Sequence, residues 1–480
     1  MNATPLERKR GEIDAKIQEH EQALLSLKAQ RNQLAPISRL SPDVLLYVFQ
    51  HVQHSSVFSH VRPSRGRARS PSQLSRTKAI THICSTWRTL ALGDPSLWTT
   101  LEFECPPLTI EMSRRSRSTP LSIYYREIEG APNTSATFLR VLDDHLDHIK
   151  FLSVSAYSKI WRASLTRSLV LGSQNHLEGF WCENRSNMGY GYVLKDVELP
   201  LELLLNSAYA LRNLGLLGCN FPKSSLSAHS MISLPHLSRI HLLSPPQSCA
   251  DFLGHITFPP SCTVLLEAYD RIGDFSSLGS FIRRFSEARS ASGFPFTSLI
   301  IGRNLEDLMG FFIRLQSTSG SAEPEHGFEL FVHYAAPLWP RTTQLEIILA
   351  ILPSVQLHQI CYLELDCDVE DAAWTYLAES CVQMTHLVAS GLGISMASPS
   401  FPPDIPTTFP NMESLVLRRC DFDPNLCRIL HGYLEHRFEK GIPIRTLVLE
   451  ASYNDAGEAS SDFIGQLQAF VTGEITYCSL

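Results

Sequence analysis

One apolar spacing recurs along most of this chain and restricts the folds open to it. The spacing is L-x-x-L-x-L-x-x-C-x-L, and its two full copies begin at Leu211 and Met412, with Phe in the last position. Copies of its first part begin at Ile149, Leu237, Ile360, Met384 and Ile444. Alternate residues of a strand point to one face, so each copy predicts a strand that buries one of its two sides. A strand that recurs in this way predicts repeated units stacked on one another.

Segments with helical spacing separate these strands. They cover residues 136–146, 199–211, 275–288, 305–315, 343–352, 372–380, 425–440 and 462–472. Strand and helix in alternation predict an α/β fold, in which a solenoid carries a parallel sheet on one side. Leu214 and Leu216 are expected on the core side of the sheet. The opposite side is expected to carry Gly215, Leu217, His241, Glu364, Asp366, Glu413 and Val416.

The middle of the chain is less regular than its two ends. Further strands are expected near residues 265–268, 299–302 and 328–333, with loops at 259–260, 337–340 and 395–408. This uneven spacing keeps an alternative open, in which residues 102–480 form two independent α/β domains instead of one solenoid.

Residues 6–34 carry a heptad pattern in a segment rich in good helix formers. One seam position holds Leu6, Ile13, His20, Leu27 and Leu34, and the alternate one holds Arg10, Ile17, Leu24 and Arg31. The pattern predicts a helix of about four heptads that associates with itself or with another protein as a short coiled coil. Polar seam residues weaken a coiled coil, so the alternative is a single amphipathic helix packed on its own chain.

Two apolar runs lie between Ala35 and Leu101. At the start of the first run, Ser41 is a good N-cap and Pro42 suits a first helical position. The apolar face of this first helix consists of Val44, Leu45, Val48, Phe49 and Val52. The face of a second helix consists of Ile80, Ile83, Cys84, Trp87, Leu90 and Ala91, and Leu97 and Trp98 follow it. Helices this short leave large apolar side chains over for a partner.

The order of these residues resembles the F-box, in the F-box-like form of large fungal (basidiomycete-type) families. The first block of the family pattern is matched by Leu40, Pro42, Asp43, Val44, Leu45, Val48 and Phe49. The second block is matched by Ile83, Cys84, Trp87, Arg88 and Ala91, and the third by Pro95, Leu97 and Trp98. Ser41 stands where the family often has Pro. The repeated strands that follow resemble the degenerate leucine-rich repeats found after many F-boxes.

The resemblance implies docking onto the Skp-type adaptor of a cullin–RING (SCF-type) ubiquitin ligase. Carried over by position, the adaptor-binding residues are Leu40, Pro42, Val44, Leu45, Val48, Phe49, Trp87 and Leu90. Trp87 and Trp98 have an alternative role, which is to fill the core of the small module. A receptor of this kind brings a target to the ligase and performs no transfer chemistry itself.

A basic segment, residues 54–75, separates the two apolar runs and is longer than a compact F-box needs. It contains Arg62, Arg65, Arg67 and Arg69 and no Asp or Glu. Its Ser, Pro and Gly content predicts a disordered surface insertion. The alternatives are a phosphate or nucleic-acid contact, a nuclear-import patch, and phosphorylation near Ser70.

Charge is distributed unevenly along the chain. Residues 1–130 contain 18 Lys and Arg against 12 Asp and Glu, and the remainder contains 23 against 36. An acidic large domain argues against a nucleic-acid binder. No window reaches the length of a membrane-spanning helix and no apolar signal opens the chain, so a cytoplasmic and/or nuclear protein is expected. The 12 cysteines include no C-x-x-C pair and are expected to be reduced.

Motifs for catalysis are missing from the sequence. There is no G-x-S-x-G, phosphate-loop, dinucleotide-binding or H-E-x-x-H pattern, so no enzyme, cofactor or metal is expected. The group closest to a zinc site is Cys420, Cys427, His431 and His436. Its two histidines lie five residues apart on a predicted helix and therefore do not share one face.

The sequence predicts three parts: residues 1–34 as a helix or short coiled coil, residues 35–101 as an all-α F-box-like module, and residues 102–480 as a leucine-rich-repeat-like α/β solenoid. The expected function is substrate recognition in a cullin–RING ubiquitin ligase. The module would bind the adaptor, and the repeats would bind a target protein whose identity is not encoded in any motif. The alternative is a non-catalytic repeat scaffold for protein–protein interaction without ligase association.

Overall fold

The structure is a computed structural model of the chain. It describes residues 4–54, 73–127, 132–157, 176–184, 204, 208–219, 231–269, 275–303, 310–317, 327–333, 341–366, 371–390, 409–420, 422, 424–451 and 461–479. The chain divides into two compact units, Met1–Val154 and Ser155–Leu480. The domain boundary predicted at residues 101/102 falls inside the first strand of the first unit.

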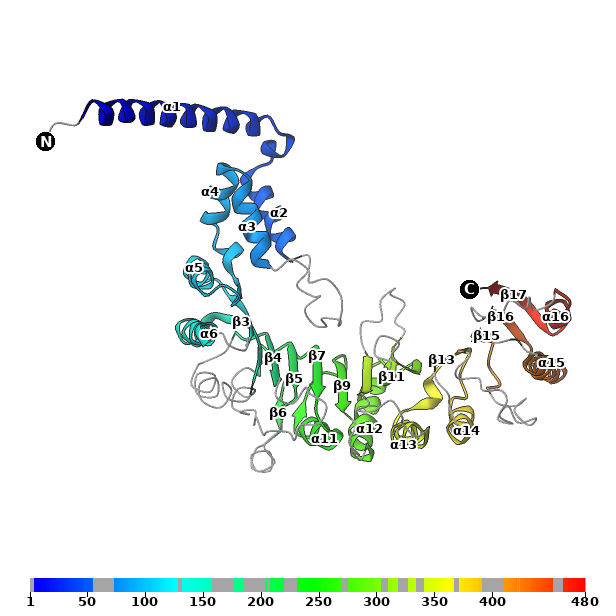
Figure 1. Ribbon diagram of the computed structural model, residues 1–480. Coiled ribbons are helices and arrows are strands. Elements are labelled where there is room, and N and C mark those ends of the chain that lie inside the picture. Colours follow the sequence, from blue (N-terminus) through cyan, green and yellow to red (C-terminus); the bar gives the residue numbers. More distant parts are fainter. Residues whose placement is uncertain are drawn as a thin grey trace. The chain divides into compact units, whose positions relative to one another are not determined.

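The first unit begins with a long helix, α1, Pro5–Gln33 (Figure 1). A reciprocal cap starts it: the Thr4 hydroxyl accepts from the Glu7 amide at 3.3 Å, and the Glu7 carboxylate accepts from the Thr4 amide at 2.6 Å. The predicted N-terminal helix is therefore confirmed. No residue of α1 is buried. The alternative that this helix packs on its own chain finds no support in the described residues.

Short helices and the first strands complete this unit. The helical elements are η1 Pro36–Arg39, α2 Pro42–His54, α3 Gln73–Ile83, α4 Ser85–Gly93, η3 Pro95–Trp98, α5 Pro106–Ser116, α6 Pro132–His145 and η4 Leu146–His148. The strands are β1 Thr100–Glu102, β2 Leu121–Arg126 and β3 Ile149–Ala156, which reaches past the division into the second unit. β1 pairs in parallel with β2, and Leu101 lies beside Ile123 in a fully buried position. Strand–helix alternation thus begins directly after η3.

One hydrogen-bonded sheet spans the second unit. Its strands are β4 Gly179–Asn184, β5 Asn213–Leu217, β7 Arg239–Leu243, β9 Thr263–Tyr269, β10 Ser298–Arg303, β11 Gly310–Gln316, β12 Gly327–His333, β13 Tyr362–Asp366, β14 His386–Ser390, β15 Ser414–Cys420, β16 Ile444–Ala451 and β17 Val471–Ser479. Their order across this unit is β4-β5-β7-β9-β12-β11-β10-β13-β14-β15-β16-β17. β6 Ile232–Ser233 and β8 Ile256–Thr257 form a separate small sheet. The expected mixed α/β fold with a large, mostly parallel sheet is confirmed.

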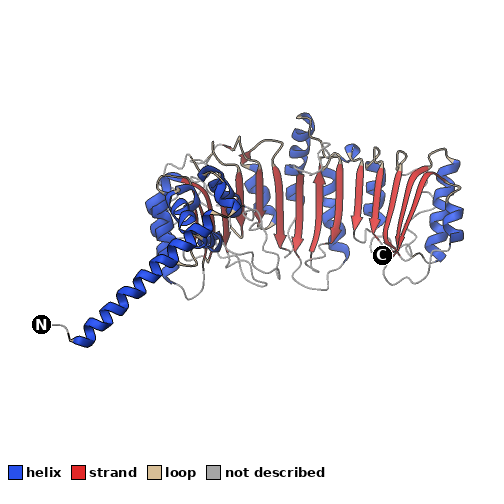
Figure 2. Ribbon diagram, turned by 90° about the horizontal axis from the view of Figure 1, so that it is seen from above, coloured by secondary structure: helices blue, strands red, loops and turns tan. Residues whose placement is uncertain are grey.

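Helices gather on one face of this sheet. They are α11 Pro246–Gly254, α12 Ser276–Ala291, α13 Arg341–Ile351, α14 Asp371–Ser380, α15 Pro424–Glu439 and α16 Ser461–Leu467, with the short turns η7 Leu352–Ser354 and η8 Leu357–Gln359. Figure 1 shows α11 to α14 in a row on one side of the strands. Figure 2 shows the strands side by side with helices behind them. We call the strand face turned away from these helices the open face.

Leucine ladders form the core between sheet and helices. In consecutive strands Leu363 lies beside Leu387, Leu387 beside Leu415, and Leu415 beside Leu447. All four side chains are buried, at 3 % exposure or less. Each of these leucines is the second apolar residue of its copy of the repeated spacing. The side of each strand that was expected to face the core is therefore confirmed. Burial of each leucine contributes about 2 kcal/mol, which makes the ladder the main stabilising feature of the repeats.

The middle of the sheet corrects one prediction. Residues 305–315 were expected to be helical, but Gly310–Gln316 is strand β11, antiparallel to both β10 and β12. Phe311, Ile313 and Leu315 are completely buried, and the residues between them are not. This alternation has the period of two that a strand requires. The aromatic and β-branched side chains here fit a half-buried strand better than a helix.

Other predicted segments agree in part. The segment 462–472 is helical only as far as Leu467 and then becomes strand β17, which the sequence analysis did not predict. Helices α5 and α11 and strands β1 and β2 were also not predicted. Most of the predicted helix 199–211, the loop 395–408 and most of the basic segment 54–75 lie outside the described residues, and the described residues 208–210 form a turn.

Two buried arginines stabilise equivalent turns. Arg289 of α12 donates to the carbonyl of Pro260 at 2.6 Å, just before β9. Arg437 of α15 donates to the carbonyls of Phe409 and Met412 at 3.2 and 3.1 Å, just before β15. Both arginines are fully buried. In each case an arginine on the helix that follows a strand binds the loop that precedes that strand. The same interaction therefore occurs in two distant repeats.

Candidate protein-binding surfaces

An aromatic pair forms the core of the module made by α2, α3 and α4. The ring of Phe49 on α2 lies 4.7 Å from that of Trp87 on α4, measured between centroids. Phe49 is completely buried, and Leu45 lies buried one turn before it. The indole N–H of Trp98 donates to the carbonyl of Ala91 at 2.8 Å. Both tryptophans therefore contact the module's own residues, as the core alternative described.

The eight residues predicted to contact an adaptor fall into three groups. Leu45 and Phe49 are buried inside the module, which leaves them no free surface for a partner. Val48, Trp87 and Leu90 are half-buried. The exposed residues are Leu40, Pro42 and Val44. The structure thus gathers the residues around α2 but assigns them to two opposite sides of that helix.

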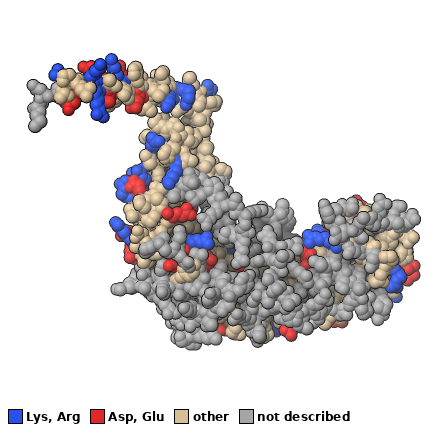
Figure 3. Space-filling model, viewed as in Figure 1, with Lys and Arg blue, Asp and Glu red and all other residues tan. Residues whose placement is uncertain are grey.

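The outer side of α2 is apolar as well as the inner side. Val44, Tyr47 and Val52 are 45, 71 and 42 % exposed, and Val48 and His51 lie between them at helical spacing. These five residues are called the outer α2 face. In the view of Figure 3 the described surface over α2 to α4 carries few charges. A helix that is apolar on both sides is expected to be covered on both sides.

A buried glutamine fixes the orientation of α2. The side-chain amide of Gln53 donates to the hydroxyl of Thr77 on α3 at 2.6 Å and to the carbonyl of Leu97 at 3.0 Å. Gln50 donates to the hydroxyl of Ser96 at 2.8 Å. Neither glutamine was among the residues predicted to form a site. The sequence does contain a signal for them: the two glutamines lie one turn apart, on a side of α2 that the valines do not occupy.

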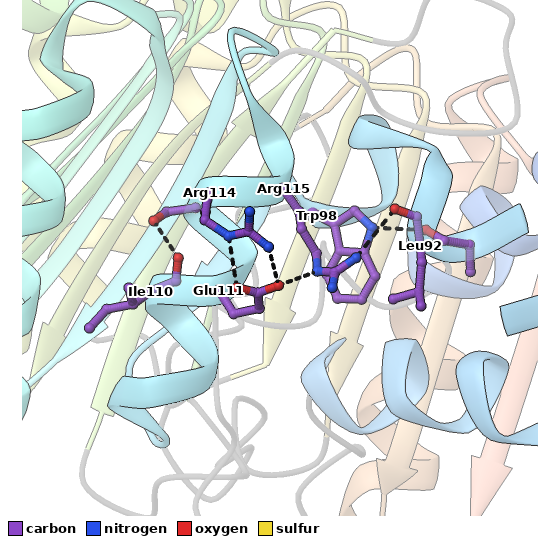
Figure 4. Close-up of polar contacts among 8 residues, drawn as sticks. Leu92, Trp98, Ile110, Glu111, Arg114 and Arg115 are labelled. Atoms are coloured by element: carbon purple, nitrogen blue, oxygen red, sulfur yellow. Dashed lines mark hydrogen bonds and ion pairs between the residues drawn. The ribbon is translucent and has the colours of Figure 1, made fainter. Parts of the chain in front are cut away.

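Helix α5 is attached to the module through charged groups (Figure 4). The guanidinium of Arg115 lies over the Trp98 ring at 5.2 Å and also donates to Glu111 at 2.7 Å. Arg114 binds the same carboxylate with two hydrogen bonds, at 2.9 and 2.8 Å. The hydrogen bond from Arg114, together with the positive charges, lowers the pKa of Glu111 to about 2. Glu111 therefore stays ionised throughout the physiological range.

The open face carries an aromatic cluster at β4 to β9. The Trp181 ring covers Gly215 on the neighbouring strand so closely that a Cβ atom there would meet the ring at 2.1 Å. The ring of His241 stands edge-on to Trp181 at 5.0 Å, and its Nε2 lies 2.9 Å from the carboxylate of Glu267. Glycine at residue 215 is thus required by the approach of the indole. His241 is 2 % exposed, so this cluster is packed and contributes little free surface.

A charged cluster occupies the open face further along the sheet. It consists of Tyr362, Glu364 and Asp366 of β13, Arg418 and Arg419 of β15, and Glu450 of β16. Arg418 lies 3.2 Å from Glu364 and 3.8 Å from Glu450, and Arg419 lies 3.9 Å from Asp366. Tyr362 donates to Glu364 at 2.6 Å, and burial raises the pKa of this tyrosine. These side chains are only partly buried, so they remain accessible to a charged partner.

A bulge in β15 aims the two arginines at the acids. The strand pairing shifts between Leu417 and Cys420, and Arg419 has a φ of 52°. The equivalent position in the other full copy of the repeat is Gly218, with a φ of 66°. The repeat therefore requires left-handed backbone at this position. Glycine adopts it freely, whereas Arg419 does so under strain.

The described residues contain no group of three or more His, Cys, Asp or Glu side chains able to hold a metal ion. Cys420 is buried in β15, while His431 stands edge-on to the ring of Phe470 at 5.0 Å. Burial raises the pKa of Cys249 and of Cys262 to about 12, which keeps both thiols protonated. Residues 367–370, between β13 and α14, lie outside the described part of the chain.

Two comparisons with known proteins were negative. Models of known protein families do not match the sequence, and a search of curated proteins finds no significant match. None of the described helices combines the length and apolar character needed to cross a lipid bilayer. The functional argument therefore rests on the surfaces described above.

Proposed function

We propose that this protein is a substrate receptor of a cullin–RING ubiquitin ligase, working in the cytoplasm or nucleus. Residues 35–101 form an F-box-like module that binds the Skp-type adaptor. The α/β region forms a leucine-rich-repeat-like solenoid that binds a target protein. The resemblance of residues 40–49 and 83–98 to the F-box pattern supports the first part of this proposal.

The outer α2 face is the observation that carries the proposal. Leu45 and Phe49 satisfy the module's own core, and Val44, Tyr47 and Val52 remain exposed on the other side of the same helix. Leu40 adds a further exposed apolar side chain just before the helix. A contact made mainly of apolar side chains suits an adaptor that binds in the same way in the F-box family.

Catalysis by proximity explains how such a chain works without a reaction centre. The module would fix the chain to the ligase, and the open face would hold a target so that its lysines come within reach of the conjugating enzyme. A positioned reactant gains a large effective concentration, and the bond-making groups belong to other subunits. The charged cluster on β13, β15 and β16 is the part of the open face best suited to select a target, because its side chains are accessible.

The test compares two matched valine substitutions in the full chain. Val44 and Val382 are both 45 % exposed, but Val382 lies beyond α14, far from the module in sequence. Val44→Asp is expected to weaken binding to the purified adaptor by at least about a hundredfold, because burying an unpaired carboxylate costs about 3 kcal/mol or more. Val382→Asp is expected to bind normally. Isothermal titration calorimetry against the adaptor measures both.

Substitutions of Leu45 and Phe49 do not provide this test. Both side chains are buried, so a charge at either position would disrupt the module itself. The proposal fails if the unmodified chain does not bind the adaptor, or if Val44→Asp binds as tightly as Val382→Asp.

The second candidate is an oligomeric scaffold that never meets a ligase. The absence of buried residues in α1 favours it, because a helix with an exposed apolar heptad seam is suited to assembly. An intact chain that assembles through α1 and does not bind the adaptor would support this candidate over the first.

A further inference from the structure

The seam of α1 is an apolar surface without a partner in the described part of the chain. Ile13, Ile17, Leu24 and Leu27 are 51, 50, 52 and 62 % exposed. They occupy four of the five heptad seam positions from residue 13 to residue 27, with His20 at the fifth, so they line one side of the helix. A stripe of this length gains stability only when a second helix covers it.

Charges flank this seam on both sides. Lys9 and Lys16 lie along one border of the stripe, and Asp14, Glu21 and Lys28 lie along the other. Figure 3 shows basic and acidic side chains mixed along α1. The first acid on that border, Glu7, is already engaged by the cap at Thr4, which lowers the pKa of its carboxyl. Lys9 and Lys16 on one border and Asp14 and Glu21 on the other are thus available to a partner helix, with Lys28 as a third basic group.

We propose that a second copy of this chain covers the seam and that the two α1 helices run parallel and in register. In a parallel pair, each residue on the first border meets the residue five positions later on the opposite border of the other helix. Lys9 then meets Asp14 of the second copy, and Lys16 meets Glu21 of the second copy. Two-fold symmetry repeats both contacts, which gives four pairs of opposite charge.

The antiparallel arrangement is less favourable for the same charges. Reversing one helix brings the borders with Asp14, Glu21 and Lys28 together, so Glu21 faces Glu21 or Asp14 of the other copy, depending on the register. Lys28 then faces Asp14 or Glu7, which gives two pairs of opposite charge, against four in the parallel arrangement. Like charges at these flanking positions oppose association and set its direction. The arginines in the seam, Arg10 and Arg31, carry long apolar stems that can lie along the stripe while their charges reach water. They lower the affinity without excluding the pair.

The first experiment uses neighbouring leucines of α1 in the full chain. Leu24 lies in the seam and Leu25 lies outside it, and both are more than half exposed. The unmodified chain is expected to be a dimer by sedimentation equilibrium. Leu24→Asp is expected to raise the dimer dissociation constant by about a hundredfold or more. Leu25→Asp is expected to leave it within about threefold, since the carboxylate stays in water.

The second experiment tests the direction of the helices by charge reversal. One chain carries Lys9→Glu with Lys16→Glu, and another carries Asp14→Lys with Glu21→Lys. In the parallel arrangement each chain alone is expected to dissociate, because all four flanking pairs become like charges. An equal mixture is expected to form a heterodimer, because all four pairs then become opposite. Sedimentation of each chain and of the mixture measures this.

Three results would overturn the proposal. They are a monomeric unmodified chain at all concentrations tested, equal effects of the Leu24 and Leu25 substitutions, and a mixture of charge-reversed chains that does not associate. A chain that binds a different protein through α1 but never itself also contradicts it. None of these results bears on adaptor binding by the outer α2 face, so the two proposals fail separately.

Discussion

At the residue scale, buried charge is used to hold backbone in place. Arg289 donates to the carbonyl of Pro260 and to the hydroxyl of Ser317, Arg437 donates to the carbonyls of Phe409 and Met412, and each guanidinium lies over an aromatic ring. Hydrogen bonds from a charged donor are stronger than those between neutral groups. Each arginine also supplies a donor to carbonyls of the loop that enters the strand.

Loss of Arg437 is expected to destabilise the protein. Arg437→Ala would remove the hydrogen bonds to the carbonyls of Phe409 and Met412 and open a cavity, at a cost of about 3 kcal/mol or more in the free energy of unfolding. Arg428 on the same helix is exposed, so Arg428→Ala is the control and should change stability by less than about 0.5 kcal/mol. Urea denaturation of both variants measures the difference, and equal stability would contradict the role assigned to Arg437.

The same two arginines show how a residue pattern reveals an element. An aromatic residue lies four positions before each arginine, and a glycine with positive φ lies four positions after it. An apolar residue and a proline come directly after that glycine. The glycines are Gly293 and Gly441, and both end a helix. This motif is a stronger repeat signal than the leucine spacing in the middle of the chain. The sequence analysis did not use it.

At the element scale, the two full repeat copies differ where their strands end. Gly218 and Arg419 occupy the same position of the repeat and both have positive φ. The strain at Arg419 places its side chain toward the acids of β13. Strain of this kind is typical of sites where backbone geometry serves binding.

Replacement of Arg419 by glycine is expected to stabilise the fold relative to alanine. Arg419→Ala retains the strained backbone, whereas Arg419→Gly removes the strain, so the glycine variant should be more stable by about 1 kcal/mol. Both variants lose the ion pair with Asp366 equally, which isolates the backbone effect. Thermal unfolding of the two variants checks this. An alanine variant as stable as the glycine variant would mean that residue 419 is not strained.

At the scale of the whole molecule, the proposed surfaces lie in different units. The outer α2 face belongs to the first unit, and the charged cluster belongs to the second. Effects of substitutions that share no partner usually add. Adaptor binding and target binding are therefore expected to be separable.

Two single substitutions in the full chain test this separation. Arg418→Glu reverses a charge in the cluster and is expected to change the set of proteins captured from cell extract while adaptor binding stays within about twofold. Val44→Asp is expected to weaken adaptor binding while the set of other captured proteins stays the same. Affinity capture with quantitative mass spectrometry reads both at once. A substitution that removes both kinds of partner would show that the surfaces are coupled.

Much of this architecture is present in the sequence by itself. Local spacing is sufficient for the long helix α1, the short helix α2 and the strands that begin near Leu214 and Leu415. The reason is physical: a helix or strand that buries one side must place apolar residues with the period of its own backbone.

Tertiary structure decided the rest. It divided the predicted contact residues between the core and the outer side of α2, because helical spacing alone does not tell which of two apolar sides finds a partner within the chain. Residues 310–316 form a strand because they pair with β10 on one side and with β12 on the other. Tertiary structure also gathered the charged cluster, whose members lie on three strands and meet only through the register of the sheet. Contacts between distant residues depend on packing, which no local pattern contains.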